Sequence, residues 1–320
     1  MSGGRQTQTL MDRRVFLKRA SLGTAAISAS RFLSASGRAV AQKYTLPTVR
    51  LGDHQVTRLI TGYNPVGGFS HATPYLSRHM REYFTVERTV ELLRHCEALG
   101  ITTFQFDLTE KVEKVLDIIW SQGSQLQFIC LHAERPDDAA LSHVIKYKPI
   151  AIVHHGGVTD RLFRAGKAQQ VHDFVKKVHD SDVLAGVSSH CPANVARMVD
   201  EGWENDFFMT CFYDLSRTRA DMLKEFGAAT VGEAFIESDP VKMTELVRQI
   251  EKPCLGFKIL AAGRKCSSRS TVAEAFQFAF QNIKPRDAVI VGMFPRYQDE
   301  VREDIEHTLT YATKQYAQPA

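Results

Sequence analysis

The sequence predicts an α/β fold in which eight parallel strands, each followed by a helix, close into a barrel. Short apolar runs alternate with segments of helical periodicity along the 320-residue chain, and most loops between them are short. Hydrophobic residues make up 44% of the chain, which is enough for a large core. A doubly wound open sheet is the alternative that the same alternation permits.

The chain order supports this count of strands and helices. A hairpin over residues 49–56 caps the barrel in this prediction. The eight predicted strands are residues 57–62, 101–106, 126–131, 150–153, 183–187, 207–213, 254–260 and 288–291. The predicted helices are residues 85–99, 112–120, 139–147, 168–179, 194–201, 240–250, 271–282 and 301–312. We expect the long excursion over residues 218–239 to fold over the barrel mouth.

Residues 1–41 have the features of an export signal. Arg13-Arg14-Val15-Phe16-Leu17-Lys18 matches the twin-arginine pattern, a weakly apolar segment follows, and Ala39-Val40-Ala41 has the form of a cleavage site. We therefore expect the twin-arginine translocation machinery to export the chain to the periplasm or the extracellular space. Residues 42–320 then form a single barrel domain, in which no stretch is apolar for long enough to span a bilayer.

Charge and cysteine usage exclude several classes of protein. The net charge of +4 is concentrated in residues 1–41, which hold seven Lys and Arg residues against one Asp, so the body is near neutral. Nothing in the charge indicates a nucleic-acid partner, and we expect a small-molecule substrate. The six cysteines lie far apart without a CxxC pair, which indicates neither a zinc ribbon nor a disulfide framework.

Hydroxyl and aromatic side chains follow two neighbouring predicted strands. Ser188 and Ser189 come directly after the strand at 183–187, and Tyr213 ends the next strand. Ligands bind at the carboxyl ends of strands in parallel barrels, where a hydroxyl and an aromatic face can orient a flat ring. Helix capping by the serines and core packing by the tyrosine are the alternatives.

Histidines, a glutamate and a lysine follow other predicted strands. Lys258 lies on the seventh strand, where it can bind an anion or a substrate carbonyl, or extend from a buried strand to solvent. The possible ligands of a divalent metal are His132, Glu134, His154 and His190. A metal-dependent lyase, isomerase or hydrolase is therefore one interpretation, although each histidine alone is also explained as a hydrogen-bonded loop residue.

Several fragments resemble the aldo/keto reductase family in their order and spacing. The fragments are Leu51-Gly52 through Arg58-Leu59 to Gly62, Leu99-Gly100-Ile101-Thr102-Thr103-Phe104, Gly186-Val187-Ser188-Ser189, Tyr213-Asp214-Leu215, and Ile290-Val291-Gly292 with Glu303-Asp304-Ile305. The resemblance implies a (β/α)8 barrel of the aldo/keto reductase type. It also implies an oxidoreductase that acts on a small polar carbonyl or sugar-type substrate.

The resemblance further implies a nicotinamide coenzyme, NAD or NADP. Ser188, with Ser189, is expected near the carboxamide, and Tyr213 is expected to stack on the ring. Arg296 is placed to meet a ribose phosphate. Glu303 and Asp304 correspond to the Glu-Asn pair of the helix that contacts adenine in this family.

The catalytic residues of the family are largely replaced. Gln105 stands in place of the Asp, His132 in place of the Lys, and only His154 matches the family's His. The candidate substitutes for acid-base chemistry are Tyr63, Glu110, Lys111, His132 and His154, with Lys258 as an anion or carbonyl binder. We expect Ser188, Tyr213, His132, His154 and Lys258 to meet around one cavity. A barrel that binds a ligand without catalysis is a third interpretation.

Overall fold

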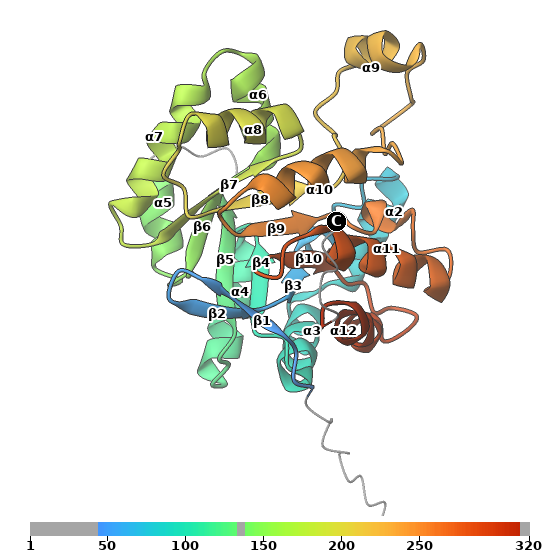
Figure 1. Cartoon of the computed structure of the whole chain (residues 1–320). Coiled ribbons are helices and arrows are strands. Elements are labelled where there is room, and N and C mark those ends of the chain that lie inside the picture. The colour runs from blue at the N-terminus through green and yellow to red at the C-terminus, as the bar shows by residue number, and fades with distance from the viewer. Residues whose placement is uncertain (1–43, 133–137, 314–320) are drawn as a thin grey trace, which may run out of the picture. The chain divides into compact units, whose positions relative to one another are not determined.

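The described part of the chain is a closed (β/α)8 barrel. The computed structural model describes residues 44–132 and 138–313. Its eight barrel strands are all parallel and run in the order β10-β3-β4-β5-β6-β7-β8-β9, with helices around them (Figure 1). The predicted fold class is confirmed, and the open sheet is not formed. The predicted signal at residues 1–41 lies outside the described residues.

The strands lie close to their predicted positions. Two short strands, β1 (Thr48–Leu51) and β2 (His54–Thr57), form the expected hairpin. The barrel strands are β3 (Leu59–Gly62), β4 (Thr103–Phe106), β5 (Gln127–His132), β6 (Ala151–His154), β7 (Leu184–Ser189), β8 (Phe207–Cys211), β9 (Cys254–Phe257) and β10 (Ala288–Gly292). Strands β5 and β6 therefore run one residue further than predicted and include His132 and His154.

Eight helices match the prediction, and several shorter ones do not. The matching helices are α3 (Val86–Leu99), α4 (Glu110–Ser121), α5 (Asp138–Ile145), α7 (Ala168–His179), α8 (Pro192–Asp200), α10 (Asp239–Gln249), α11 (Arg269–Asn282) and α12 (Glu300–Tyr311). The unpredicted ones are α1 (Asn64–Gly67), α2 (Pro74–Tyr83), α6 (Gly156–Arg164), α9 (Arg219–Phe226) and the 3-10 turn η1 (Ala261–Gly263). No described helix is both long and apolar enough to cross a bilayer.

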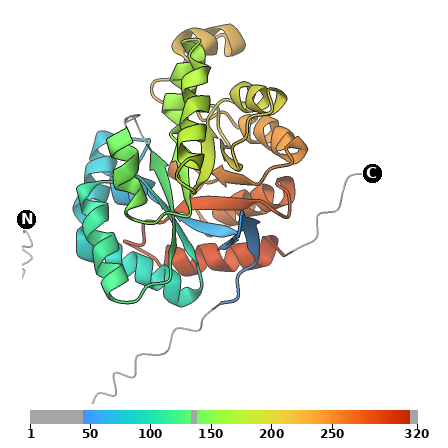
Figure 2. The ribbon, with the colours of Figure 1, turned by 90° about the vertical axis from the view of Figure 1, so that its left-hand side faces the viewer.

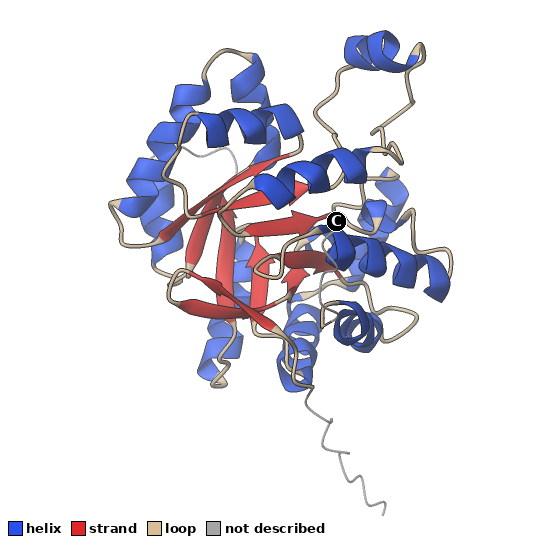
Figure 3. Ribbon diagram, in the orientation of Figure 1, coloured by secondary structure: helices blue, strands red, loops and turns tan. Residues whose placement is uncertain are grey.

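Side chains on the barrel strands alternate between two cores. Those that point inward fill the barrel with branched and aromatic groups, among them Ile129, Val153 and Met209. Their sequence neighbours, such as Cys130 and Ile152, pack outward beneath the helices. Figures 2 and 3 show the strands enclosed by these helices, while α9 projects away from the ring. The same alternation continues to the strand ends and determines which polar residues reach the barrel mouth.

A buried arginine joins the first and last strands at the amino-terminal end of the barrel. Arg58 precedes β3, and its guanidinium donates to the backbone oxygens of Asp287 (2.8 Å), Ala312 (2.8 Å) and Lys284 (3.0 Å). The same group lies over the ring of Phe280. Because burial outweighs the attraction of Asp287, the pKa of Arg58 falls to about 10, so the group stays charged at neutral pH. These bonds fasten the closure between β3 and β10.

Replacing Arg58 with Met should therefore destabilise the protein by about 3–5 kcal/mol, because three buried carbonyl oxygens lose their donors. Urea unfolding followed by circular dichroism measures this loss. The control is Arg50→Met, since Arg50 is exposed and pairs only with Asp53 at 3.3 Å; its effect should stay within about 0.5 kcal/mol. A loss below about 1 kcal/mol for Arg58→Met would show that the closure does not depend on this side chain.

Candidate active site

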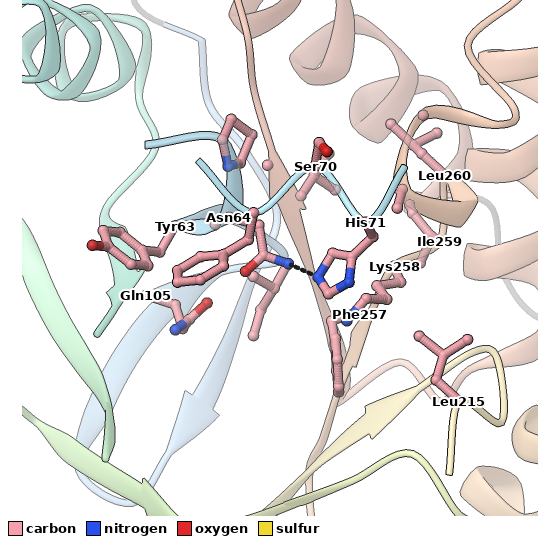
Figure 4. Close-up of a pocket in the computed structure, with 18 of the residues that line it drawn as sticks. Tyr63, Asn64, Ser70, His71, Gln105, Leu215, Phe257, Lys258, Ile259 and Leu260 are labelled. Atoms are coloured by element: carbon pink, nitrogen blue, oxygen red, sulfur yellow. Dashed lines mark hydrogen bonds between the residues drawn. The ribbon is translucent and has the colours of Figure 1, made fainter. Parts of the chain in front are cut away.

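A cavity of about 720 Å³ lies at the carboxyl ends of the strands. Its volume falls within the usual range for small-molecule sites. Figure 4 shows Tyr63 and Gln105 on one side of it and His71 and Lys258 on the other. Apolar side chains such as Phe257 and Leu215 complete the walls. The cavity therefore combines an apolar lining with a few polar groups, as ligand sites do.

One polar group of the cavity is a histidine held by a buried aspartate. Nδ1 of His190, just beyond β7, lies 2.9 Å from Oδ2 of Asp160 on α6. Asp160 also accepts hydrogen bonds from the backbone N–H of His190 (3.1 Å), from Ser189 Oγ (2.6 Å) and from Asn194 Nδ2 (3.0 Å). The carboxylate therefore fixes the ring with Nδ1 protonated. Nε2 has no partner within the described ranges and is left as an acceptor at the cavity wall.

Electrostatics keep Asp160 ionised and His190 neutral. Although burial raises the pKa of the Asp160 carboxyl, the hydrogen bonds from His190 and Ser189 outweigh it and hold that pKa below its usual value. Burial lowers the pKa of His190, and the charge of Lys258 lowers it further, against the opposing effect of Asp160. At neutral pH the site therefore holds an ionised carboxylate and a neutral imidazole, which is the state of a general base.

Gly156 allows this arrangement. A Cβ at this position would lie 2.8 Å from Ser188 Oγ and 3.1 Å from His190 Cε1, so only glycine lets the start of α6 approach the end of β7. As a result, Asp160 reaches His190 from the neighbouring strand-helix unit.

Lys258 is held at the cavity in an uncommon backbone conformation. It follows β9 with φ at +58°, a left-handed value that is uncommon outside glycine and occurs often at functional sites. Its Nζ lies 5.1 Å from the centre of the Phe257 ring, and the His190 ring lies 5.5 Å from the same ring. Across the described residues no carboxylate or hydrogen-bond acceptor pairs with its ammonium group. Lys258 therefore offers a positive charge to a ligand near His190.

Three loops meet above these groups. His71, after β3, pairs through Nδ1 with Glu233 Oε1 at 2.8 Å, and Glu233 belongs to the excursion after β8. Arg264, after β9, donates to the backbone oxygen of His71 at 2.9 Å and covers the ring of Phe235 at 3.9 Å. Of the excursion over residues 218–239, Glu233 lines the cavity, whereas α9 extends away from the barrel (Figure 1). The excursion as a whole therefore does not fold over the barrel mouth as expected.

Only some of the sequence-predicted residues line this cavity. Ser188, Lys258, Glu303 and Asp304 do so, and so does His190, which the sequence suggested only as a metal ligand. Tyr63 also reaches the cavity, and its hydroxyl lies 3.5 Å from Thr109 Oγ1.

His132 and His154 do not line the cavity. They are the last residues of β5 and β6, where the alternation turns them outward against Phe174 of α7, at ring-centre distances of 5.6 and 5.0 Å. Nδ1 of His154 lies 2.7 Å from Thr159 Oγ1. Their inward-facing neighbours are Leu131 and His155, which line the cavity instead. The roles predicted for His132 and His154 at a shared site therefore find no support in this geometry.

The other predicted residues also lie away from the cavity. Glu110 pairs at the surface with Lys114, and Lys111 donates to the backbone oxygens of Val66 and Phe84. Ser189 faces Asp160, and Arg296 is exposed over the ring of Tyr83. Tyr213 packs on Phe235, and its buried hydroxyl lacks a partner in the described chain. The expected meeting of five side chains around one cavity is therefore reduced to Ser188 and Lys258.

The predicted metal site is not assembled among the described residues. His190 faces the cavity while His132 and His154 face α7, and no group of three or more His, Cys, Asp or Glu side chains there is arranged to hold an ion. Glu134 lies outside the described residues. The metal interpretation thus gains no support from the part of the barrel that the structure describes.

Sequence reasoning assigned no site role to several acidic residues that line the cavity, among them Asp160 and Glu233. Asp160 lies on α6, which was not predicted, and Glu233 lies within the long excursion. A helix-period pattern is present in residues 156–164, but its two leading glycines and its short length obscure it. Extending the strand alternation beyond each strand would have favoured His155 and His190 over their neighbours.

Comparisons with known proteins identify the fold alone. No family model and no curated protein sequence matches the chain. Among solved structures it is similar to Gox0644 in its apo form, at 13% identity and a TM-score of 0.51, with 87% of this chain and 97% of that one covered. A second similar structure is the glycerol dehydrogenase AKR11B4 from Gluconobacter oxydans, at 10% identity and a TM-score of 0.47, with 85% of this chain and 98% of that one covered. A third is dihydropteroate synthase from Thermus thermophilus, at 14% identity and a TM-score of 0.46, with 82% of this chain and 98% of that one covered.

The buried His154 predicts a stability that falls with acid. Burial first, and then the nearby His155 and His132, lower its pKa to about 3, whereas an unfolded histidine titrates near 6.5. The unfolded state therefore binds this proton first, and the free energy of unfolding should decrease as pH falls from about 6.5 towards 3. At about 1.4 kcal/mol for each pK unit the loss is on the order of several kcal/mol.

Urea unfolding of the wild type and His154→Gln between about pH 8 and pH 4 tests this expectation. The variant should lose less stability over this range, so the two curves should converge as pH falls. His143→Gln is the control, because His143 is a surface histidine paired with Glu113. Parallel curves for the wild type and His154→Gln would show that His154 is not the cause of the loss of stability in acid.

Proposed function

We propose that this chain is an oxidoreductase of the aldo/keto reductase type, which acts on a small polar carbonyl compound or sugar with His190 as its acid and base. The observation that carries the proposal is the 2.9 Å contact between His190 and the buried Asp160 at the wall of the cavity, next to Lys258. The ordered resemblance of the sequence to that family favours this reaction class over the many others that (β/α)8 barrels support.

His190, Asp160 and Lys258 each have a separate role at one substrate oxygen. The neutral imidazole of His190 accepts the proton of a substrate hydroxyl at Nε2 in the oxidation direction, and returns it in the reduction direction. Asp160 orients the ring and stabilises the imidazolium that forms. The ammonium group of Lys258 lies near enough to attract the negative charge that develops on the same oxygen. Because the pKa of His190 is lowered, the ring is neutral at neutral pH and can accept a proton in the oxidation direction.

The cavity offers suitable groups to a nicotinamide coenzyme, NAD or NADP. Bound there, such a coenzyme would accept a hydride from the substrate carbon or return it. Ser188 would hold its carboxamide beside His190, and Glu303 and Asp304 would accept hydrogen bonds from its other end. Asp304 supports this fit, because it is a buried acceptor on the cavity wall without a partner in the described chain.

A second candidate is proton abstraction next to a carbonyl, as in an isomerase or lyase. The neutral His190 lies near Lys258, which has no hydrogen-bond or ion-pair partner in residues 44–132 and 138–313, and this favours the second candidate. A base and a cation that polarises a carbonyl are all that such a step needs. This reaction requires no coenzyme. Exchange of substrate hydrogen with solvent deuterium in the absence of nucleotide would distinguish it from hydride transfer.

Export by the twin-arginine machinery is proposed from the sequence of residues 1–41. Replacing Arg13 and Arg14 together with lysine should leave the protein in the cytoplasm, whereas the unchanged chain should reach the periplasm or the medium in a shorter, processed form. Immunoblots of cell fractions measure both outcomes. Export of the double-lysine variant at an unchanged level would contradict the proposed pathway.

The oxidoreductase proposal is tested first by coenzyme binding and then by turnover. The emission of reduced nicotinamide is the suitable signal, because Trp120 and Trp203 do not line the cavity. Enhancement of this emission on adding the protein, followed by nucleotide reduction or oxidation with a panel of small aldehydes, keto-sugars and polyols, supports the proposal. If neither binding nor turnover is detected at millimolar nucleotide, the oxidoreductase proposal is wrong.

Variants then test the assigned residues. His190→Gln should lower kcat by about 10²–10⁴-fold, and Asp160→Asn should lower it by a similar factor, because the ring loses its proton acceptor and its orientation. Lys258→Met should lower kcat by about 10²-fold. The matched control is a second Asp-His pair, His179 and Asp206, which lie 2.9 Å apart and do not line the cavity. If His190→Gln retained full kcat with an active substrate, histidine acid-base catalysis would be ruled out.

A further inference from the structure

One end of the cavity is lined by three carboxyl groups. Glu300, Glu303 and Asp304 come from the first turns of α12, which follows β10, and all three line the cavity that His190 and Lys258 share. Glu303 and Asp304 are buried, with 7% and 4% of their surface exposed. The cavity therefore has a cationic end near β9 and an acidic end at α12.

Asp304 differs from its two acidic neighbours in having no partner for its carboxyl group among the described residues. Glu303 accepts from Arg269 Nε (2.7 Å) and Gln298 Nε2 (3.1 Å), and Glu300 accepts from the backbone N–H of Phe294 (2.6 Å). By contrast, the carboxyl of Asp304 forms no hydrogen bond or ion pair with any residue in the described chain. An unpaired buried polar group is costly. A ligand that donates a hydrogen bond at this end of the cavity would satisfy it.

Additional negative charge is disfavoured here. Burial raises the pKa of Asp304 well above its usual value, and Glu300 and Glu303 raise it further. Burial also raises the pKa of Glu300. The cation predicted to meet a ribose phosphate, Arg296, is exposed over Tyr83 and does not line the cavity. Arg269, the nearest cation, already pairs with Glu303 and Glu306 on the outer surface.

We infer that the Glu300–Glu303–Asp304 end of the cavity rejects a phosphate monoester, so that the chain binds NAD(H) in preference to NADP(H). The inference rests on the proposed function. Because hydride transfer would require the nicotinamide beside His190 and Lys258, the adenosine half would occupy the remaining end of the cavity. There the free ribose hydroxyls and the adenine amino group would donate hydrogen bonds to carboxyl oxygens. A 2′-phosphate would instead meet three acidic groups, and α12 contributes no cation to the lining.

Titration of the full chain with NADH and NADPH at the same ionic strength tests the inference. Nicotinamide emission gives both dissociation constants without turnover. We expect NADH to bind at least tenfold more tightly. The variants Asp304→Asn and Glu300→Gln should each lower the preference for NADH, measured as the ratio of the NADPH to the NADH dissociation constant, by threefold or more. The amide oxygen still accepts a hydrogen bond but does not oppose a phosphate. Glu306→Gln, on the same helix but outside the cavity, is the matched control.

The outcomes separate the inference from the proposed function. Equal or tighter binding of NADPH overturns the inference and leaves coenzyme use intact. A preference for NADH that neither variant reduces also overturns it, because the carboxyl groups are then not its cause. If neither nucleotide binds, the proposed function fails and the inference fails with it.

Discussion

The alternation of side chains along eight closed strands is the constraint on which the site depends. Barrel closure fixes every strand in register with two neighbours, for example His132 opposite His154 and Ser188 opposite Met209. No strand can then slip by one residue without turning its apolar side chains out of the core. The polar residues at the strand ends follow the same alternation between inward and outward directions. Ser188 and His190 thus face the cavity, while Ser189 between them faces α6.

This constraint explains which features of the fold and the site could be predicted from the sequence. The positions and order of the strands follow from apolar runs, so the barrel was predictable. The orientation of a residue at a strand end depends on one position, and apolar runs locate strand ends only to within a few residues. β5 and β6 each extend one residue beyond their predicted ends, which makes His132 and His154 outward-facing strand residues. Asp160 was missed for a different reason, because it lies on a short helix with two leading glycines.

The groups at the cavity wall differ in how firmly they are held. His190 belongs to a network in which α6, the end of β7 and α8 all contact one carboxylate, so its ring has little freedom. The pair formed by His71 and Glu233 joins two loops instead, and Glu233 is exposed. Positioning by packed elements and covering by loops is the usual division in (β/α)8 enzymes. The choice of ligand should therefore depend more on the loops than on the Asp-His pair.

Asp160 and Asp304 show how surroundings give one residue type two functions. Both are almost fully buried, with 5% and 4% of their surface exposed. Asp160 accepts four hydrogen bonds, which keep its pKa low, so it holds a ring in place and does not exchange protons. Asp304 accepts none in the described chain and lies beside two other acids, so its pKa is high. A group of the second kind contributes little to the stability of the empty barrel, because its burial is costly without a partner. Its position is better explained by a ligand that donates a hydrogen bond at that end of the cavity.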